Sequence, residues 1–359
     1  MHIKQLEVKN IRNFEKLSLT PSSSFNFIFG NNGSGKTSIL EMISLITTTR
    51  SFRTNRLSNI QTKGSNEFFL FCKIDSDGIE NKIGYQKQHQ TRKIKLNQVY
   101  ITKSSEIALL FPVIIFTPES LYLLTEGSKV RRSFIDRILF HVKHDYSFHH
   151  KSYERTLRQR NGQLKTGNVK LVSQWDEVLA KHGMWIAKER EKIFSELNLV
   201  LLKVLERLGI EQFENLTFKI NHGWDQTLSL LDSLISTCDK DIHLGYTSVG
   251  VHRADFHLHA NNRSIRDIYS RGEMKLLSFA LHLSQLIYLG RSLKSKSILL
   301  IDDLFAEIDK TNIDKLMTTL RHFNSQTFIT TTDEALLNKY YLDGDKVFHV
   351  EHGKLKVVL

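Results

Sequence analysis

The segment Gly30-Asn31-Asn32-Gly33-Ser34-Gly35-Lys36-Thr37 decides the fold class. It follows a strand-like run at residues 25–29 and precedes apolar residues at helical spacing over residues 38–47. This order of strand, glycine-rich loop and helix is that of a phosphate-binding P-loop. Glycines permit positive φ angles, so that backbone N–H groups close around phosphate oxygens, and the helix N-terminus adds partial positive charge. We therefore predict an ATP site in which Lys36 reaches the β- and γ-phosphates and the Thr37 hydroxyl coordinates Mg²⁺.

A second motif is Ser297-Ile298-Leu299-Leu300-Ile301-Asp302-Asp303. Its apolar run is typical of a strand buried on both faces of a parallel sheet, and both acids then lie at the ligand-binding end of that strand. Successive strand residues point to opposite sides, which argues against a simple carboxylate dyad. We expect Asp302 to hold Mg²⁺ through water and Asp303 to orient or deprotonate the attacking water. The alternative is a strand end capped by two solvated acids.

A third motif, Tyr269-Ser270-Arg271-Gly272-Glu273-Met274-Lys275, opens a helix about thirty residues before the Asp302 strand. It resembles the signature sequence of ABC ATPases, from which Tyr269 and Glu273 depart. Ser270, the Gly272 backbone and the helix N-terminus would form a second anion site. In ABC proteins this site binds the γ-phosphate held by the opposite subunit, so the resemblance implies a homodimer. Taken alone, Ser-x-Gly-Glu is no more than a helix cap.

Two further segments are similar to ABC elements. Ala306-Glu307-Ile308-Asp309 matches the D-loop that crosses the ABC dimer interface. The strand at residues 328–330, leading to Thr331-Thr332-Asp333, occupies the switch position, where many ABC proteins have histidine. Many of them also have glutamate where this chain has Asp303.

The order of strand-like and helical segments predicts an α/β fold, an ABC-type ATPase head built on a P-loop mixed sheet, with an inserted helical lobe. Residues 1–120 are expected to form the N-terminal part of the ATPase lobe, with further strands between residues 67 and 101. Residues 121–240 are rich in helix formers and are expected to be the helical lobe. Residues 241–359 would complete the ATPase core.

Charge and composition indicate the kind of partner. The chain of 359 residues carries a formal net charge of +12, which favours nucleic acid or an anionic membrane surface. Basic residues cluster at 85–103 and 143–170, where they suit phosphate contacts or form a merely solvated face. No helix-turn-helix or zinc-finger signature is evident, so we expect a nucleic acid to be recognised through its backbone and shape, independently of base sequence.

The chain's location follows from what the sequence lacks. It contains no run of apolar residues long enough to span a membrane and no signal peptide. Its two cysteines, Cys72 and Cys238, argue against a disulfide framework or a zinc site. We expect a cytoplasmic protein without a membrane partner.

Short segments spread over nearly the whole chain resemble the RecF family, relatives of the SMC proteins without their long coiled-coil arms. They are residues 10–14, 50–53, 116–119, 131–136, 251–256 and 329–333. The resemblance implies a protein of recombinational repair and replication restart that dimerises on ATP and binds double-stranded and gapped DNA. It also implies slow ATP hydrolysis that acts as a switch, help in loading recombinase at single-strand gaps, and RecR and RecO as partners.

Two other functions share the P-loop. A soluble ATPase subunit of a membrane transporter normally needs a much shorter stretch between P-loop and signature, whereas here more than half the chain intervenes. A small-molecule kinase would not need the helix start at Ser270.

Overall fold

The computed structural model describes residues 1–359 except 168, 211–212, 214, 294–295 and 304–307, and the backbone alone of Leu336. The described residues form two compact units. Unit 1 contains residues 1–120, 207–209 and 279–359, and unit 2 contains residues 121–206 and 210–278.

A mixed sheet, here called the core sheet, is the centre of unit 1. Its strand order is β15-β14-β3-β13-β12-β8, and only β15 runs antiparallel to its neighbour. The strands are β3 (Phe25–Phe29), β8 (Val113–Phe116), β12 (Ile298–Ile301), β13 (Thr327–Thr331), β14 (Lys346–Glu351) and β15 (Lys354–Val357). Every residue of β3, β12 and β13 is buried, as expected for strands covered on both faces. The predicted mixed α/β sheet is confirmed.

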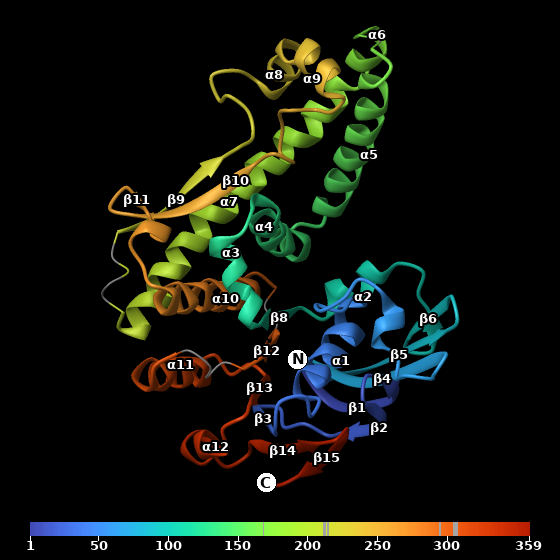
Figure 1. Ribbon diagram of the computed structural model, residues 1–359, viewed down its shortest axis with the longest axis vertical. Helices are drawn as coiled ribbons and strands as arrows, with labels where there is room; N and C mark the ends of the chain where they lie inside the picture. Colours follow the sequence, from blue (N-terminus) through green and yellow to red (C-terminus); the bar gives the residue numbers. More distant parts are fainter. Residues whose placement is uncertain (168, 211–212, 214, 294–295, 304–307) are drawn as a thin grey trace. The chain divides into compact units, whose positions relative to one another are not determined.

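The second sheet of unit 1, here called the N-terminal sheet, is antiparallel with the order β2-β1-β4-β5-β6-β7. Its strands are β1 (His2–Ile11), β2 (Phe14–Leu19), β4 (Glu67–Ser76), β5 (Ile79–Gln88), β6 (Thr91–Leu96) and β7 (Val99–Tyr100). Helix α1 (Lys36–Thr48) contacts strands of both sheets (Figure 1). The P-loop helix therefore holds the two sheets together through its buried side chains.

Further helices complete unit 1. They are η1 (Leu57–Ile60), α2 (Ser104–Leu110), α11 (Lys310–His322) and α12 (Glu334–Tyr340). Asp309 caps α11 by accepting a 2.9 Å hydrogen bond from the Asn312 N–H. In the segment predicted to be a D-loop, Ala306 and Glu307 lie outside the described residues, and Ile308 and Asp309 lie just before α11.

Unit 2 is mainly helical. Its elements are η2 (Pro118–Leu121), α3 (Tyr122–Thr125), α4 (Ser128–Val142), α5 (Tyr146–Leu164), α6 (Val169–Ser173), α7 (Asp176–Leu208), β9 (Leu216–Asn221), α8 (Leu230–Ser236), α9 (Cys238–Leu244), β10 (Asp255–Ala260), β11 (Arg263–Ser264), η4 (Ile265–Asp267) and α10 (Arg271–Leu293), of which η2, α7 and α10 continue into unit 1. Fully buried Arg160 ties α5 to α7 and α9 through 2.7 Å ion pairs with Asp176 and Asp241.

The division of the chain differs from the predicted one at its second boundary. Unit 2 extends to Ser278, whereas the sequence placed the end of the helical lobe at residue 240. The reason is a three-stranded antiparallel sheet in which β10 pairs with both β9 and β11. This pairing joins residues 255–264 to the preceding helices, and periodicity along the sequence does not reveal it.

Candidate nucleotide site

The P-loop has the backbone conformation that its glycines predict. Gly30, Gly33 and Gly35 have φ angles of 150°, 78° and 119°, which disfavour any residue with a Cβ atom. Helix α1 begins at Lys36, directly after the loop. The Lys36 ammonium donates hydrogen bonds to the carbonyls of Gly30 at 2.7 Å and Asn31 at 3.0 Å. The loop thus closes around the position where Lys36 can meet phosphate oxygens.

Two distant segments hold the P-loop from outside. The Asn13 side-chain amide donates a 2.7 Å hydrogen bond to the Ser34 carbonyl. Gly353, in the turn between β14 and β15, lies so close that a Cβ atom there would be 2.0 Å from the Asn13 carbonyl oxygen. A Cβ atom on Gly30 would lie 2.2 Å from the Val350 carbonyl oxygen. Glycine at these positions is therefore required by close backbone packing as well as by φ.

Asp302 joins the two nucleotide motifs. Its Oδ1 atom accepts hydrogen bonds from the hydroxyls of Thr37 at 2.9 Å and Thr330 at 2.7 Å. Burial raises the pKa of Asp302, and the hydrogen bonds from Thr330 and Thr37 oppose that rise. Hydroxyl and carboxylate oxygens are the ligands that Mg²⁺ prefers, so Thr37 and Asp302 fit a Mg²⁺ ion.

The backbone leaves the extended conformation of β12 at Asp303. Its φ angle is 50°, a left-handed conformation that is uncommon for a residue other than glycine. Its N–H donates a 2.9 Å hydrogen bond to the Thr330 hydroxyl, and no described contact ties its carboxylate to Asp302. Burial lowers the pKa of Lys36, while the carboxylates of Asp303 and Asp302 act in the opposite direction.

A buried glutamate on α1 forms a network that the sequence did not indicate. Glu41 is fully buried, and its carboxylate accepts hydrogen bonds from Arg12 Nε at 2.8 Å and Arg12 Nη2 at 2.7 Å. The Ser51 hydroxyl donates to the same carboxylate at 2.5 Å, and Arg53 Nη1 lies 3.5 Å from it. The network anchors the loop after α1 to the P-loop helix. Arg12, Ser51 and Arg53 fall within the family-like segments, but Glu41 carries no such signal.

That loop lines a polar cavity of about 450 Å³. The cavity is formed by Ser51, Phe52, Arg53, Thr54, Asn55, Arg56 and Asn59. The charge of Arg53 also lowers the pKa of Asp302, although weakly compared with burial. The cavity thus lies on the loop that Ser51 and Arg53 tie to α1, and it is large enough for part of a ligand.

The signature-like segment belongs to unit 2, whereas the P-loop belongs to unit 1. Its Ser270 hydroxyl and N–H both donate 2.7 Å hydrogen bonds to Glu273 Oε2, and the Glu273 N–H donates to Ser270 Oγ at 3.4 Å. This reciprocal pair is a capping box at the start of α10. Gly272 has open space around its Cβ position. Within unit 1 the structure brings together Lys36, Thr37, Asp302 and Asp303, and it places Ser270 and Gly272 in the other unit.

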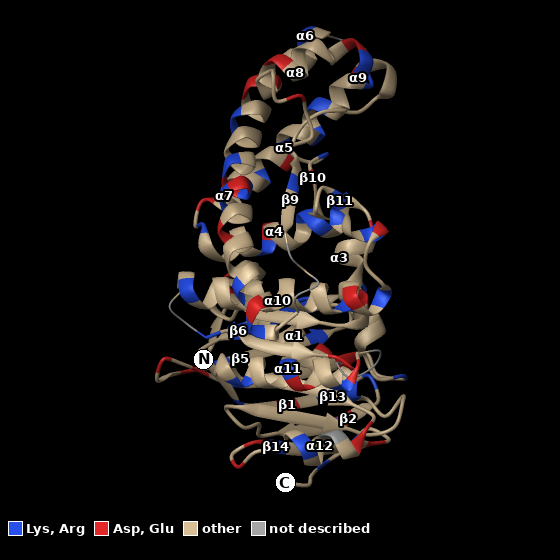
Figure 2. Ribbon diagram, turned by 90° about the vertical axis from the view of Figure 1, so that its left-hand side faces the viewer, with Lys and Arg blue, Asp and Glu red and all other residues tan. Residues whose placement is uncertain are grey.

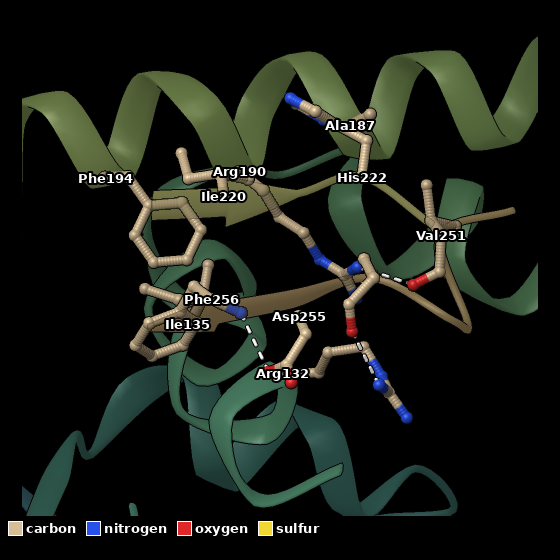
Figure 3. A pocket seen from close by; sticks show the side chains of 11 residues that line it. Arg132, Ile135, Ala187, Arg190, Phe194, Ile220, His222, Val251, Asp255 and Phe256 are labelled. Atoms are coloured by element: carbon tan, nitrogen blue, oxygen red, sulfur yellow. Dashed lines mark hydrogen bonds between the residues drawn. The ribbon is translucent and has the colours of Figure 1, made fainter. Parts of the chain in front are cut away.

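A second hollow lies in unit 2 between α4, α7 and β10 (Figure 3). It encloses about 20 Å³, room for about one water molecule. Arg190 donates to the Val251 carbonyl at 2.8 Å and pairs with Asp136, while Arg132 donates to the Ala254 carbonyl at 2.7 Å. These arginines are engaged in holding the unit together, and the hollow is too small for a nucleotide.

Among the described residues there is no cluster of three or more His, Cys, Asp or Glu side chains suited to a metal ion. Cys72 and Cys238 are both buried and free. In the same part of the chain, no helix has the length and apolar character needed to cross a membrane.

The core sheet, the P-loop after β3 and the aspartate after β12 define the head of an ABC-type ATPase. The family model of the RecF/RecN/SMC N terminal domain matches residues 2–356. Two curated relatives, each a DNA replication and repair protein RecF, cover nearly the whole chain. The protein of Pseudoalteromonas translucida is 34% identical and covers 99% of both chains, and that of Shewanella denitrificans is 31% identical and covers 100% of both. The chain belongs to the RecF family of DNA replication and repair proteins.

Solved structures agree with this assignment. The recombination mediator protein RecF-ATP in the RecFOR pathway superposes with a TM-score of 0.87 at 28% identity, covering 100% of this chain and 98% of that one. An Smc head domain derived from Pyrococcus furiosus, bound to the C-terminal domain of ScpA, has a TM-score of 0.59 at 18% identity, with 99% and 96% coverage. The second likeness shows the fold alone.

Proposed function

We propose that this protein is an ATP-dependent DNA-binding switch of recombinational repair and replication restart. The observation that carries the proposal is the contact of Thr37 with Asp302, which joins the P-loop to the end of β12 at 2.9 Å. ATP would lie along residues 30–37, with Lys36 on its β- and γ-phosphates. The solved RecF relative named with ATP supports the choice of nucleotide.

Each side chain of the site has a proposed task. Thr37 and Asp302 would hold Mg²⁺, which when bound offsets the negative charge of the phosphates. Asp303 would orient or deprotonate the attacking water. Its left-handed backbone and the hydrogen bond from its N–H to Thr330 distinguish it from Asp302, whose carboxylate is held by Thr37 and Thr330, so the two acids can do different work. Because an aspartate is shorter than a glutamate, we expect hydrolysis to be slow.

A second copy of the chain would complete the binding site for the γ-phosphate. Ser270 and Gly272 lie at the N-terminus of α10, a helix of 23 residues whose N-terminal N–H groups favour anions. The Ser270 hydroxyl is engaged by Glu273, so phosphate would have to compete with that carboxylate for it. Dimerisation on ATP therefore requires this capping box to open or to share its donor.

We propose that the dimer binds duplex and gapped DNA and helps to load recombinase, with RecR and RecO as partners, in the cytoplasm. Support comes from the net charge of +12 and from the family, one member of which is named a recombination mediator in the RecFOR pathway. Figure 2 shows Lys and Arg on elements of both units, interspersed with acids. The relatives named above favour neither a transporter subunit nor a kinase.

The experiment is size-exclusion chromatography with light scattering, with and without ATP and Mg²⁺, repeated with duplex and gapped DNA. We expect ATP to produce dimers and DNA to bind them more tightly. Lys36→Ala should abolish nucleotide binding, whereas Asp303→Asn should bind ATP, stop hydrolysis and accumulate dimers. If ATP leaves self-association unchanged over a wide dilution series, the switch is wrong. If Asp303→Asn hydrolyses ATP at the parent rate, the role of Asp303 is wrong.

A further inference from the structure

The N-terminal sheet has one buried face. Alternate side chains of β4, β5 and β6 point to this face and are almost fully buried; they are Phe68, Leu70, Cys72, Ile74, Ile83, Tyr85 and Ile94. Phe68 and Tyr85 stack at 5.6 Å between ring centroids. Helix α1 contacts β1, β4 and β5, so this face belongs to the core of unit 1.

The opposite face, here called the open face, carries aromatic side chains that are not buried. Phe69 is 39% exposed and Tyr100 is 59% exposed, and Phe71 is partly exposed between them. Exposed apolar side chains that gather on one face mark an interaction site, whereas single scattered ones do not. The two paired rows that cross the sheet show how they are arranged.

One row runs Lys16–Lys9–Phe69–Gln86–Lys93, and the next runs Ser18–Glu7–Phe71–Gly84–Lys95–Tyr100. Paired residues on neighbouring strands lie on the same face, about 5 Å apart. Each row therefore places an aromatic ring on β4 and a lysine on β6. The Lys95 ammonium lies 4.6 Å from the centre of the Tyr100 ring, which confirms that both side chains are on this face.

The open face is basic along β6, the strand beside the edge strand β7. In the part of the chain that the structure describes, no carboxylate lies within salt-bridge distance of Lys93 or Lys95, and both are exposed. The acids of this face are mostly engaged at its margins, where Glu67 pairs with Lys9 at 3.8 Å and Glu80 with Lys82 at 4.0 Å. The more central Glu7 accepts a hydrogen bond from Gln5. A polyanion can thus approach β6 without meeting an adjacent acid.

Gly84 leaves a bare backbone between Phe71 and Lys95. A Cβ atom there would meet nothing within 4 Å, so packing within the chain does not require glycine at this position. Its φ angle is not positive either, and glycine in a strand interior costs stability. A flat ligand that lies on the sheet would explain the residue, because a side chain would hold it away from the neighbouring rings.

We infer that the open face binds single-stranded nucleic acid, an inference that rests on the proposed function in DNA repair. Bases would stack on Phe69, Phe71 and Tyr100, and Lys93 and Lys95 would contact the phosphates. Aromatic rings beside lysines on a sheet suit unpaired bases, since bases within a duplex offer no free face for stacking. Binding would be independent of base sequence and sensitive to salt.

The test is fluorescence anisotropy with a labelled oligo(dT) and, separately, a duplex of equal length in the presence of ATP and Mg²⁺. Phe69→Ala with Tyr100→Ala should weaken oligo(dT) binding roughly a hundredfold, since each stacked ring contributes about tenfold. Each phosphate contact with a single strand contributes about 0.7 to the slope of log affinity against log salt. Lys93→Gln with Lys95→Gln removes two contacts and should therefore make this slope shallower by about 1.4. Tyr122→Ala and Lys203→Gln, at exposed positions of unit 2 outside both basic clusters, are the matched controls and should change neither.

A second readout locates the contact directly. Oligo(dT) carrying 5-iododeoxyuridine should crosslink to peptides containing Phe69, Phe71 or Tyr100. The inference is overturned if both double variants keep the parent's oligo(dT) affinity, or if crosslinks occur only in other segments. In either case the proposed function stands as long as the protein still binds duplex DNA with ATP. The double variants should also be tested with phosphatidylserine vesicles. If they lose vesicle binding but bind oligo(dT) as the parent does, the inference is overturned in favour of a membrane surface. If the parent binds neither DNA, the proposed function itself fails.

Discussion

The Thr330 hydroxyl donates a 2.7 Å hydrogen bond to Asp302 Oδ1 and accepts a 2.9 Å hydrogen bond from the Asp303 N–H. One threonine of β13 therefore positions both acids that follow β12. The arrangement is possible because β12 and β13 are adjacent parallel strands whose carboxyl ends meet. We conclude that the threonine at the switch position has a positioning task even before a nucleotide is considered.

Replacing Thr330 with valine keeps the shape but removes the hydroxyl. Burial already raises the pKa of Asp302, so loss of this hydrogen bond should raise it further and weaken Mg²⁺ binding. A hydrogen bond to a charged group contributes about 1.5–3 kcal/mol, which corresponds to roughly 10- to 100-fold in apparent Mg²⁺ affinity. ATPase activity titrated with Mg²⁺ measures the effect. Thr330→Ser should remain near the parent, and an unchanged Mg²⁺ dependence in Thr330→Val would refute the assigned role.

Gly353 and Gly344 offer a matched pair. Both have positive φ, 73° and 94°, so alanine strains the backbone by about 1–2 kcal/mol at either position. Only at Gly353 would the new Cβ atom also collide with the Asn13 backbone, while Gly344 faces open space. We expect Gly353→Ala to lower ATP affinity at least tenfold through displacement of Asn13 from the P-loop, and Gly344→Ala to leave it unchanged. Equal affinities, measured by calorimetry, would show that Asn13 does not support the loop.

Glu41→Gln should destabilise the protein, because it leaves Arg12 and Arg53 beside a buried neutral side chain. Breaking a buried ion pair costs about 3–5 kcal/mol, and the partial exposure of both arginines reduces the expected loss to roughly 2–3 kcal/mol. Urea unfolding monitored by circular dichroism is the measurement. The exposed Glu15→Gln is the control. A loss no larger than in that control would mean that the network contributes little.

Unit 2 should lose stability at mildly acidic pH through His252. Its ring accepts or donates hydrogen bonds with Tyr153 at 2.7 Å and the Thr247 carbonyl at 3.1 Å, and burial lowers its pKa to about 4. Because this pKa lies below the unfolded value near 6.5, the stabilisation is present above pH 6.5 and is lost as the pH falls towards 4. The loss at pH 5 should be about 2 kcal/mol.

Tryptophan fluorescence reports on this unit, since Trp175, Trp185 and Trp224 all lie in it. Unfolding midpoints at pH 7 and pH 5 should differ less in His252→Gln, whose amide does not titrate, than in the parent. The same difference in both proteins would assign the acid sensitivity to other groups.

Local patterns were sufficient for the elements of the site. The strand at residues 25–29, the P-loop and the start of α1 lie together in sequence, so glycine placement and periodicity determine their structure without help from distant residues. The buried strand before Asp302 is equally local.

Tertiary structure decided which distant side chains meet. The contact of Thr37 with Asp302 spans 265 residues, and the roles of Thr330, Glu41 and Asn13 also depend on neighbours far away in the chain. The open face of the N-terminal sheet is of the same kind, because Phe69 and Lys93 share a row only through the registers of β4, β5 and β6. Sequence alone determined the elements through local backbone preferences and hydrophobic period. Strand order and register depend on long-range pairing, which only the folded chain reveals.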